Sequence, residues 1–170
     1  MYLSTSSFLA FWIFCATALA RTDAPAPGFD LQDQFGKLHQ VAFPKARVSV
    51  LAFADRAGSE QLEGWVRPLY ERYRETIDIH GVAKLAGVPA ALRGMLRAIF
   101  RRNLDYPVMM DWTGAVSTNY RCEARVANVV VLSPAGRIEY RFNGKTSPAE
   151  LKQCFERIDG LLATPAPRAE

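Results

Sequence analysis

The strongest constraint on the fold is an apolar run that ends abruptly in a polar loop. Residues 48–54 (VSVLAFA) are apolar apart from Ser49, and residues 55–59 (DRAGS) then interrupt the run. A strand with apolar side chains at successive positions has to be covered on both faces, as in the middle of a sheet flanked by helices. Residues 59–76 follow with apolar side chains at the helical spacing of three to four residues, namely Leu62, Val66, Leu69 and Tyr73. The sequence therefore predicts a strand–loop–helix unit of an α/β fold.

Strands and helices alternate along the rest of the chain. A small N-terminal hairpin is predicted for residues 29–31 and 38–41, and later strands for residues 77–83, 106–110, 126–132 and 137–142. Further helices are predicted for residues 89–102, within 111–120, and from Ser147, which begins a capping box. In the helix of residues 89–102, we expect Leu92, Leu96 and Ile99 to face the sheet. This order predicts a three-layer α/β/α sandwich with a mixed central sheet and an N-terminal β-hairpin.

Three local patterns in this order resemble a known family. They are the opening segment 26–37 (APGFDLQDQFGK), the closing hairpin 129–138 (VVVLSPAGRI) and Gly144 before the last helix. From about Pro27 to Leu162 the chain resembles the redoxin branch of the thioredoxin-like fold, which includes peroxiredoxins and exported thiol–disulfide oxidoreductases. The resemblance implies a reactive cysteine in the loop or first helical turn after the central strand, and a cis-proline just before the closing hairpin.

Neither of these implied features is present. No cysteine lies between Val48 and Tyr73. An alignment on the helix proline, Pro68, places Glu60 and Glu63 at the cysteine positions, whereas an alignment on the strand end places the loop 56–59 there. The proline position falls on Ala127 or Asn128 in sequence. The resemblance thus implies the fold without its ordinary redox chemistry.

Both ends of the chain differ in composition from the middle. Residues 1–20 carry no charged side chain and end in Ala18-Leu-Ala20, which predicts a signal peptide cleaved after Ala20; a membrane anchor is the alternative. Residues 21–27 and 164–170 are proline-rich and predict a tether and a tail without packed structure. The domain is predicted to span residues 28–163. The predicted signal peptide indicates that the mature protein is periplasmic or extracellular.

The charge of the chain excludes some partners. A net charge of +4 and a pI near 9.1 are mildly basic and carry no nucleic-acid motif. His39 and His80 lie in separate predicted strands without cysteines or carboxylates at metal-ligand spacing, so we predict no metal and no cofactor. The expected partner is a protein or peptide of the cell envelope. Membrane contact is expected only through the leader or weakly through the surface.

The loop after the central strand is the first candidate binding site. Its residues, with one from the facing hairpin, are Asp55, Arg56, Gly58, Ser59 and Asn128. Free amides at a helix start, together with Arg56, suit an anion. The alternative is that Asp55 and Ser59 only cap the loop while Arg56 is solvated.

Two cysteines, Cys122 and Cys154, remain after the predicted cleavage. They form a stapling disulfide, two buried thiols, or a redox-active pair in which Arg121 and Arg125 stabilise the Cys122 thiolate. Arg93, Arg97 and Arg101 are spaced to lie on one helix face, which is either solvated or a docking face for an acidic partner or anionic lipid headgroups.

Two functional hypotheses follow from these residues. The first is an exported binding or scaffold module of the cell envelope without ordinary thiol catalysis. The alternative is a thiol–disulfide oxidoreductase or peroxide-reducing enzyme that uses Cys122, with Cys154 as its resolving partner.

Overall fold

The computed structural model describes residues 25–163, so the predicted leader, most of the tether and the tail lie outside the described residues. Its strands are β1 (Phe29–Gln32), β2 (Leu38–Val41), β3 (Ser49–Ala54), β4 (Asp78–Lys84), β5 (Val108–Asp111), β6 (Asn128–Leu132) and β7 (Ile138–Asn143). Its helices are α1 (Ser59–Tyr73), α2 (Ala90–Asn103), α3 (Ala115–Asn119) and α4 (Pro148–Ala163). Within the described part of the chain, none of these helices combines the length and apolar character needed to cross a bilayer.

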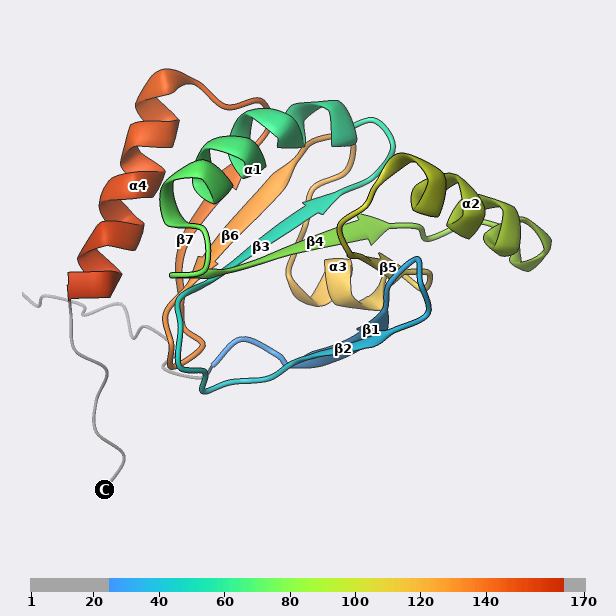
Figure 1. The fold of residues 1–170 in the computed structure, drawn as a ribbon, viewed down its shortest axis with the longest axis horizontal. Coiled ribbons are helices and arrows are strands. Elements are labelled where there is room, and N and C mark those ends of the chain that lie inside the picture. Colours follow the sequence, from blue (N-terminus) through green and yellow to red (C-terminus); the bar gives the residue numbers. More distant parts are fainter. Residues whose placement is uncertain (1–24, 164–170) are drawn as a thin grey trace, which may run out of the picture.

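The central sheet has five strands in the order β5-β4-β3-β6-β7 (Figure 1). β3 pairs in parallel with β4, and β4 with β5, whereas β6 is antiparallel to both β3 and β7. All six residues of β3 are buried, as the apolar run in the sequence predicts. β1 and β2 form a separate antiparallel hairpin. The predicted mixed sheet with an N-terminal hairpin is therefore confirmed.

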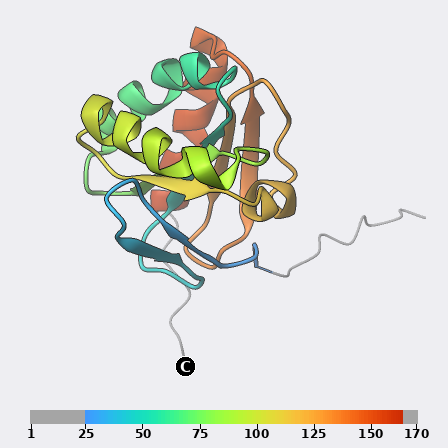
Figure 2. The same cartoon turned by 90° about the vertical axis from the view of Figure 1, so that its right-hand side faces the viewer.

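Two apolar cores lie on opposite faces of this sheet. Alternation along β3 sends Val48 and Val50 into one core and Leu51 and Phe53 into the other. Helices α1 and α4 cover the first core, and the hairpin with α3 covers the second, as the two views show (Figures 1 and 2). These layers are the predicted α/β/α sandwich.

Helix α1 packs around Trp65, which fills the core as its aromatic side chain predicts. Trp65 is fully buried, its ring lies 5.0 Å from that of Phe142, and its Nε1 donates to the Gly144 carbonyl oxygen at 2.9 Å. Leu69 and Tyr73 are buried as predicted, whereas Leu62 and Val66 are only partly buried. A tryptophan covers more area than either aliphatic residue, so it sets the rotation of the helix.

The N-terminal hairpin is anchored to the edge of the sheet by Gln34. Its Nε2 donates to the Tyr106 carbonyl oxygen at 2.7 Å, and its Oε1 accepts from the Val108 N–H at 2.8 Å. Asp33 also forms an isolated bridge with Met109 of β5. Ala26, predicted to belong to an unpacked tether, is buried in the second core instead, because its N–H donates to the Gly136 carbonyl oxygen at 2.8 Å.

Helix α2 is oriented against the prediction. No residue of α2 is buried, and two of the side chains expected to face the sheet, Leu92 and Ile99, are 46% and 45% exposed. Its inner side instead carries Arg93 and Arg97, whose guanidinium carbons lie 5.4 and 5.9 Å from the Trp112 ring centroid. The expectation is wrong for Leu92 and Ile99, because the arginines occupy the inner side, whereas Leu96 is partly buried.

Candidate functional site

The candidate site lies where β3 ends and α1 begins. Phe53, near the end of β3, pairs with Asn128 at the start of β6, so the loop after β3 and the segment before β6 meet at one edge of the sheet. Lys84, the last residue of β4, reaches the same edge: its Nζ donates to the carbonyl oxygens of Cys122 at 3.3 Å and Glu123 at 2.6 Å. The site is therefore built from three chain segments far apart in sequence.

Asp55 joins two of these segments. One carboxylate oxygen accepts from the Gly58 N–H at 2.9 Å and the other from the Arg125 N–H at 2.7 Å. Burial raises the pKa of Asp55, but the backbone donors at Arg125, Gly58 and Ala57, with the charge of Lys84, outweigh it and lower the pKa below its ordinary value. The group is thus a carboxylate at neutral pH. We name residues Asp55, Gly58 and Arg125 the aspartate clasp.

The clasp occupies the amides that the sequence offered to an anion. The Ser59 N–H donates to the Asp55 carbonyl oxygen at 3.0 Å, and the Ser59 hydroxyl donates to the Arg56 carbonyl oxygen at 2.8 Å. A negative ligand at this helix start would also face the Asp55 carboxylate. Arg56 itself is exposed. This geometry favours the capping interpretation of the loop over the anion-binding one.

The helix start and the segment before β6 are in close contact. A Cβ added at Gly58 would overlap the Val126 carbonyl group, so only glycine fits there. The Ala127 N–H, at one of the two positions where the resemblance implied a cis-proline, donates to Gln61 Oε1 at 3.1 Å. The Asn128 side chain bonds to the backbone of the segment just before β6. Its Oδ1 accepts from the Glu123 N–H at 2.6 Å, and its Nδ2 donates to the Glu123 and Val126 carbonyl oxygens at 3.0 Å.

Cys122 is a partly buried free thiol at this edge. Burial raises the pKa of Cys122 to about 11, because Lys84 and Arg141 offset the loss of solvation only in part. The sequence singled out Arg121 and Arg125 for this role, but the positive charges that act on the thiol are those of Lys84 on β4 and Arg141 on β7. A thiol with such a pKa is protonated at neutral pH and is a poor nucleophile.

Cys154 lies on the other side of the sheet. It is buried in the core under α1 and α4, whereas Cys122 packs against the core under the hairpin. Both are free thiols, and burial raises the pKa of Cys154 to about 12. The predicted pairing, as a staple or as a reactive and resolving couple, is not found because the sheet separates the two sulfur atoms.

The histidines and the arginine face lie elsewhere. His39 Nε2 is 2.7 Å from Asp33 Oδ2, and His80 Nε2 is 3.2 Å from Lys45 Nζ. Among residues 25–163 no group of three or more metal-binding side chains of the His, Cys, Asp or Glu type is present. Arg93 and Arg97 stack on Trp112, while Arg101 is exposed, so the three arginines do not form one solvated face.

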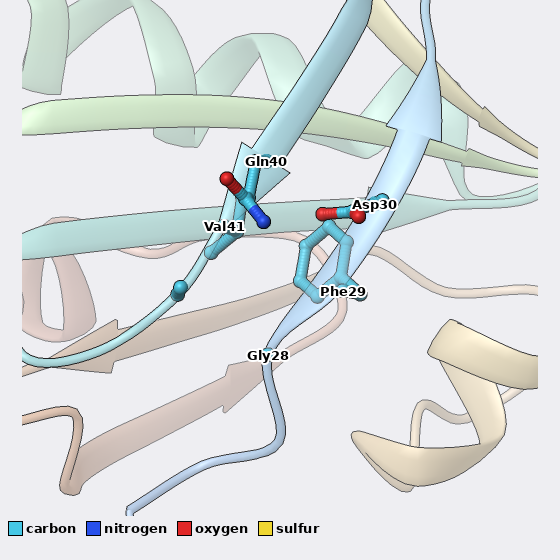
Figure 3. A pocket seen from close by; sticks show the side chains of 6 residues that line it. Gly28, Phe29, Asp30, Gln40 and Val41 are labelled. Carbon is cyan, nitrogen blue, oxygen red and sulfur yellow. The ribbon is translucent and has the colours of Figure 1, made fainter.

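A shallow hollow on the hairpin does not belong to this site. It lies between β1 and β2 and is lined by Gly28, Phe29, Asp30, Gln40, Val41 and Ala42. In Figure 3 the side chains of Asp30 and Gln40 lie on opposite strands of the hairpin, with the Phe29 ring below them. Asp30 and Gln40 are the two polar side chains that line this hollow, and we assign the hollow no function.

Two residues of the site were missed by the sequence analysis. Lys84 directly follows a predicted strand, and side chains at the carboxyl ends of strands are those expected at a functional edge. That signal was available. Gln61 gave no signal, because its role depends on the Ala127 N–H, 66 residues away.

Solved structures place this architecture among known folds. No family model and no curated protein matches the chain. A Chlorobium tepidum protein assigned as the thiol:disulfide interchange protein DsbE superposes with a TM-score of 0.62 at 16% identity, covering 82% of this chain and 96% of that one. The exposed lipoprotein thioredoxin of Streptococcus pneumoniae gives 0.60 at 16% identity, over 76% and 98%.

A third structure agrees with these two. StoA of Bacillus subtilis gives a TM-score of 0.57 at 15% identity, covering 75% of this chain and 96% of that one. Identities this low show a shared fold and not a shared activity. The chain therefore has a thioredoxin-like fold, similar to that of the solved thiol:disulfide interchange protein, and has no cysteine where β3 meets α1.

Proposed function

We propose that this chain is an exported binding or scaffold module of the cell envelope that does not carry out thiol–disulfide exchange. The observation that carries the proposal is the aspartate clasp, which occupies the junction of β3 and α1 with a hydrogen-bonded carboxylate. A redox site at a helix start needs a thiolate that the free amides and the helix dipole stabilise. Here the Gly58 N–H donates to the Asp55 carboxylate and the Ser59 N–H to the Asp55 carbonyl oxygen, and the junction contains no thiol.

Export is supported by two observations. The uncharged first twenty residues end in Ala18-Leu-Ala20, the pattern that precedes signal-peptide cleavage. One of the similar structures is described as an exposed lipoprotein thioredoxin. The binding partner that we propose is a protein or peptide, for which the exposed side chains of Arg56 and Arg125 offer positive charge beside the clasp.

The enzyme hypothesis based on Cys122 has less support. Its resolving partner, Cys154, is on the opposite face of the sheet, and the pKa of Cys122 is raised to about 11. A thiol enzyme needs the reverse shift.

Thiol-dependent assays test the catalytic half of the proposal. The purified protein is assayed for insulin disulfide reduction with dithiothreitol and for peroxide consumption, beside Cys122→Ser and the buried-thiol control Cys154→Ser. We expect all three proteins to match the rate without protein. Turnover by the wild type that disappears in Cys122→Ser and persists in Cys154→Ser would overturn the proposal.

Export has its own test. The full chain is expressed in a bacterial host, the periplasmic fraction is isolated, and the N-terminal residue is determined by mass spectrometry. We expect a mature chain that begins at Arg21. A chain that keeps residues 1–20 and stays in the cytoplasm would contradict the proposed location.

A further inference from the structure

Helix α2 presents an apolar stripe to solvent. Leu92, Met95 and Ile99 are 46%, 58% and 45% exposed, and these positions lie on one side of the helix at the three-to-four residue spacing. Figure 1 shows α2 projecting from the end of the molecule opposite α4, and Figure 2 shows it in front of the sheet. Exposed apolar side chains in such a row indicate an interaction surface rather than scattered surface residues.

The opposite side of α2 holds the helix in this orientation. Arg93 and Arg97 both stack on the Trp112 ring, and Arg97 also donates to Gln32 Oε1 of β1 at 3.2 Å. Gln34 fixes the segment after the helix through Leu104 and Tyr106. The outward apolar stripe is therefore the arrangement that the neighbouring residues maintain.

The charge of α2 has one sign. Residues 90–103 contain four arginines and no aspartate or glutamate. Arg101 and Arg102 are exposed, and Arg102 borders the apolar stripe with Met95, Ala98, Ile99 and Asn103 around a shallow hollow of about 270 Å³. A surface that covers this helix has to accept aliphatic side chains and positive charge together.

These properties select among the surfaces that could cover α2. Residues 90–103 of a second copy carry no carboxylate that could pair with Arg102, so a symmetric contact leaves its charge uncompensated. Helix α2 projects from the end of the molecule, so a flat surface can reach the stripe (Figure 1). A helix with an apolar face flanked by arginines is typical of segments that lie in the interface of an anionic bilayer.

We propose that α2 docks this protein on the surface of an anionic phospholipid bilayer. Leu92, Met95 and Ile99 enter the boundary between headgroups and acyl chains. Arg102, which borders the stripe, binds a lipid phosphate beside it. The inference rests on the proposed binding function and deepens it by naming a lipid surface as what this face of the module binds.

Vesicle sedimentation tests the proposal with the full chain. Vesicles of phosphatidylglycerol and phosphatidylcholine are compared with vesicles of phosphatidylcholine alone, for the wild type, Met95→Glu and Arg102→Gln. We expect the wild type to bind the anionic vesicles more strongly than the neutral ones. We expect Arg102→Gln to lose about five-fold in partitioning to the anionic vesicles, because one arginine near an anionic surface contributes that much.

Matched controls separate α2 from the rest of the chain. Leu162→Glu makes the same kind of change on α4, where Leu162 is exposed, and Arg67→Gln removes one positive charge from an exposed site on α1. We expect Leu162→Glu to bind like the wild type and Arg67→Gln to bind within a factor of about two of it. All variants keep residues 1–20, so any contribution of that segment is the same in each.

Three results would overturn the proposal. They are equal binding of wild type, Met95→Glu and the α2 arginine variant, equal binding to anionic and neutral vesicles, and no vesicle binding by the wild type. The last result would leave an acidic protein as the ligand class for α2. The thiol assays do not depend on lipid, so redox activity would overturn the proposed function and leave the vesicle result standing on its own.

Discussion

Asp55 connects its own loop to Arg125, which lies 70 residues further along the chain. Its carboxylate accepts from the Arg125 N–H in one loop and the Gly58 N–H in the other, and both loops flank the helix start. Hydrogen bonds to an ionised carboxylate are stronger than those between neutral groups. A single side chain thus closes the edge where the fold's relatives are expected to expose a cysteine.

The clasp predicts a loss of stability in Asp55→Asn. The amide keeps one acceptor but places an N–H donor against a backbone donor, so we expect the free energy of unfolding to fall by about 2–3 kcal/mol. Urea denaturation measures this. Asp30→Asn on the exposed surface of the hairpin is the control, with an expected change below about 0.5 kcal/mol. An equal change in the two variants would show that the clasp contributes nothing.

The raised pKa of Cys122 predicts slow alkylation. A shift from 9.0 to about 11 lowers the thiolate fraction near pH 7.5 by about 100-fold. We expect iodoacetamide to modify Cys122 about that much more slowly than a cysteine peptide, with a rate that rises up to about pH 11. Peptide mapping by mass spectrometry reports each cysteine separately. Fast modification at neutral pH would contradict the shielded thiol.

Sequence reasoning recovered the residues of this edge but not their connections. Asp55, Gly58, Ser59 and Asn128 all lie at the predicted edge, because a break after a buried strand and the start of a pairing strand are local signals. The hydrogen bond from Arg125 to Asp55 depends on how two distant loops meet. No periodicity or spacing within either loop encodes that meeting.

At the scale of elements, the position of α1 depends on the absence of one side chain. Gly58 precedes the helix, and its backbone lies directly against the Val126 carbonyl group. Helix α1 could not begin so close to the segment before β6 with any larger residue there. The strand–loop–helix unit is consequently fixed at its first turn as well as by the burial of Trp65.

This contact predicts opposite outcomes for two glycine substitutions. Gly58→Ala should lower the free energy of unfolding by about 1–3 kcal/mol, because the added methyl group overlaps the Val126 carbonyl. Gly94→Ala lies within α2, where an added Cβ has no atom within 4 Å, and should raise stability by about 0.5–1 kcal/mol. Urea denaturation of both variants checks the pair. Stabilisation by Gly58→Ala would refute the close contact.

Most helices and strands were predictable from the sequence, but the side of α2 that faces the sheet was not. Continuous apolar runs, turn glycines and the Ser147–Glu150 capping box gave the strands and helices, and the box is present with Ser147 Oγ 2.7 Å from a Glu150 carboxylate oxygen. In α2 the apolar and arginine sides were both visible in sequence. Apolar periodicity assumes that the apolar side faces the core, and here Trp112 attracts the arginine side instead.

For the whole molecule, several groups make the fold sensitive to acid. Burial, with the charge of Lys45, lowers the pKa of His80 to about 4. For Asp33, burial raises the pKa, but hydrogen bonds from His39 and from the backbone of Lys37 and Phe35 outweigh it, so the pKa is lowered. The pKa of Asp55 is lowered in the same way.

These shifts predict a decline in stability in two stages. The unfolded chain binds a proton at His80 near pH 6.5 and the folded chain only near pH 4, so stability falls as the pH drops between these values, by about 2–3 kcal/mol. Below the ordinary carboxyl pKa of 3.8, protonation of Asp33 and Asp55 removes further stability. Urea midpoints from pH 8 to pH 3 measure both stages.

His80→Gln isolates the first stage, because glutamine keeps an acceptor for Lys45 but does not titrate. We expect the variant to lose the decline between pH 6.5 and pH 4 and to keep the decline below it. A variant with the same pH profile as the wild type would exclude His80 as the cause.

The pairing of β3 determines how early in synthesis the central sheet can form. This central strand, Ser49–Ala54, pairs on one side with β4 and on the other with β6, Asn128–Leu132, and β7 closes the sheet at Asn143. A growing chain therefore cannot complete its cores until most of it has left the ribosome. If the chain is exported as proposed, it would therefore leave the cell before its central sheet is complete only while β6 and β7 are still unpaired.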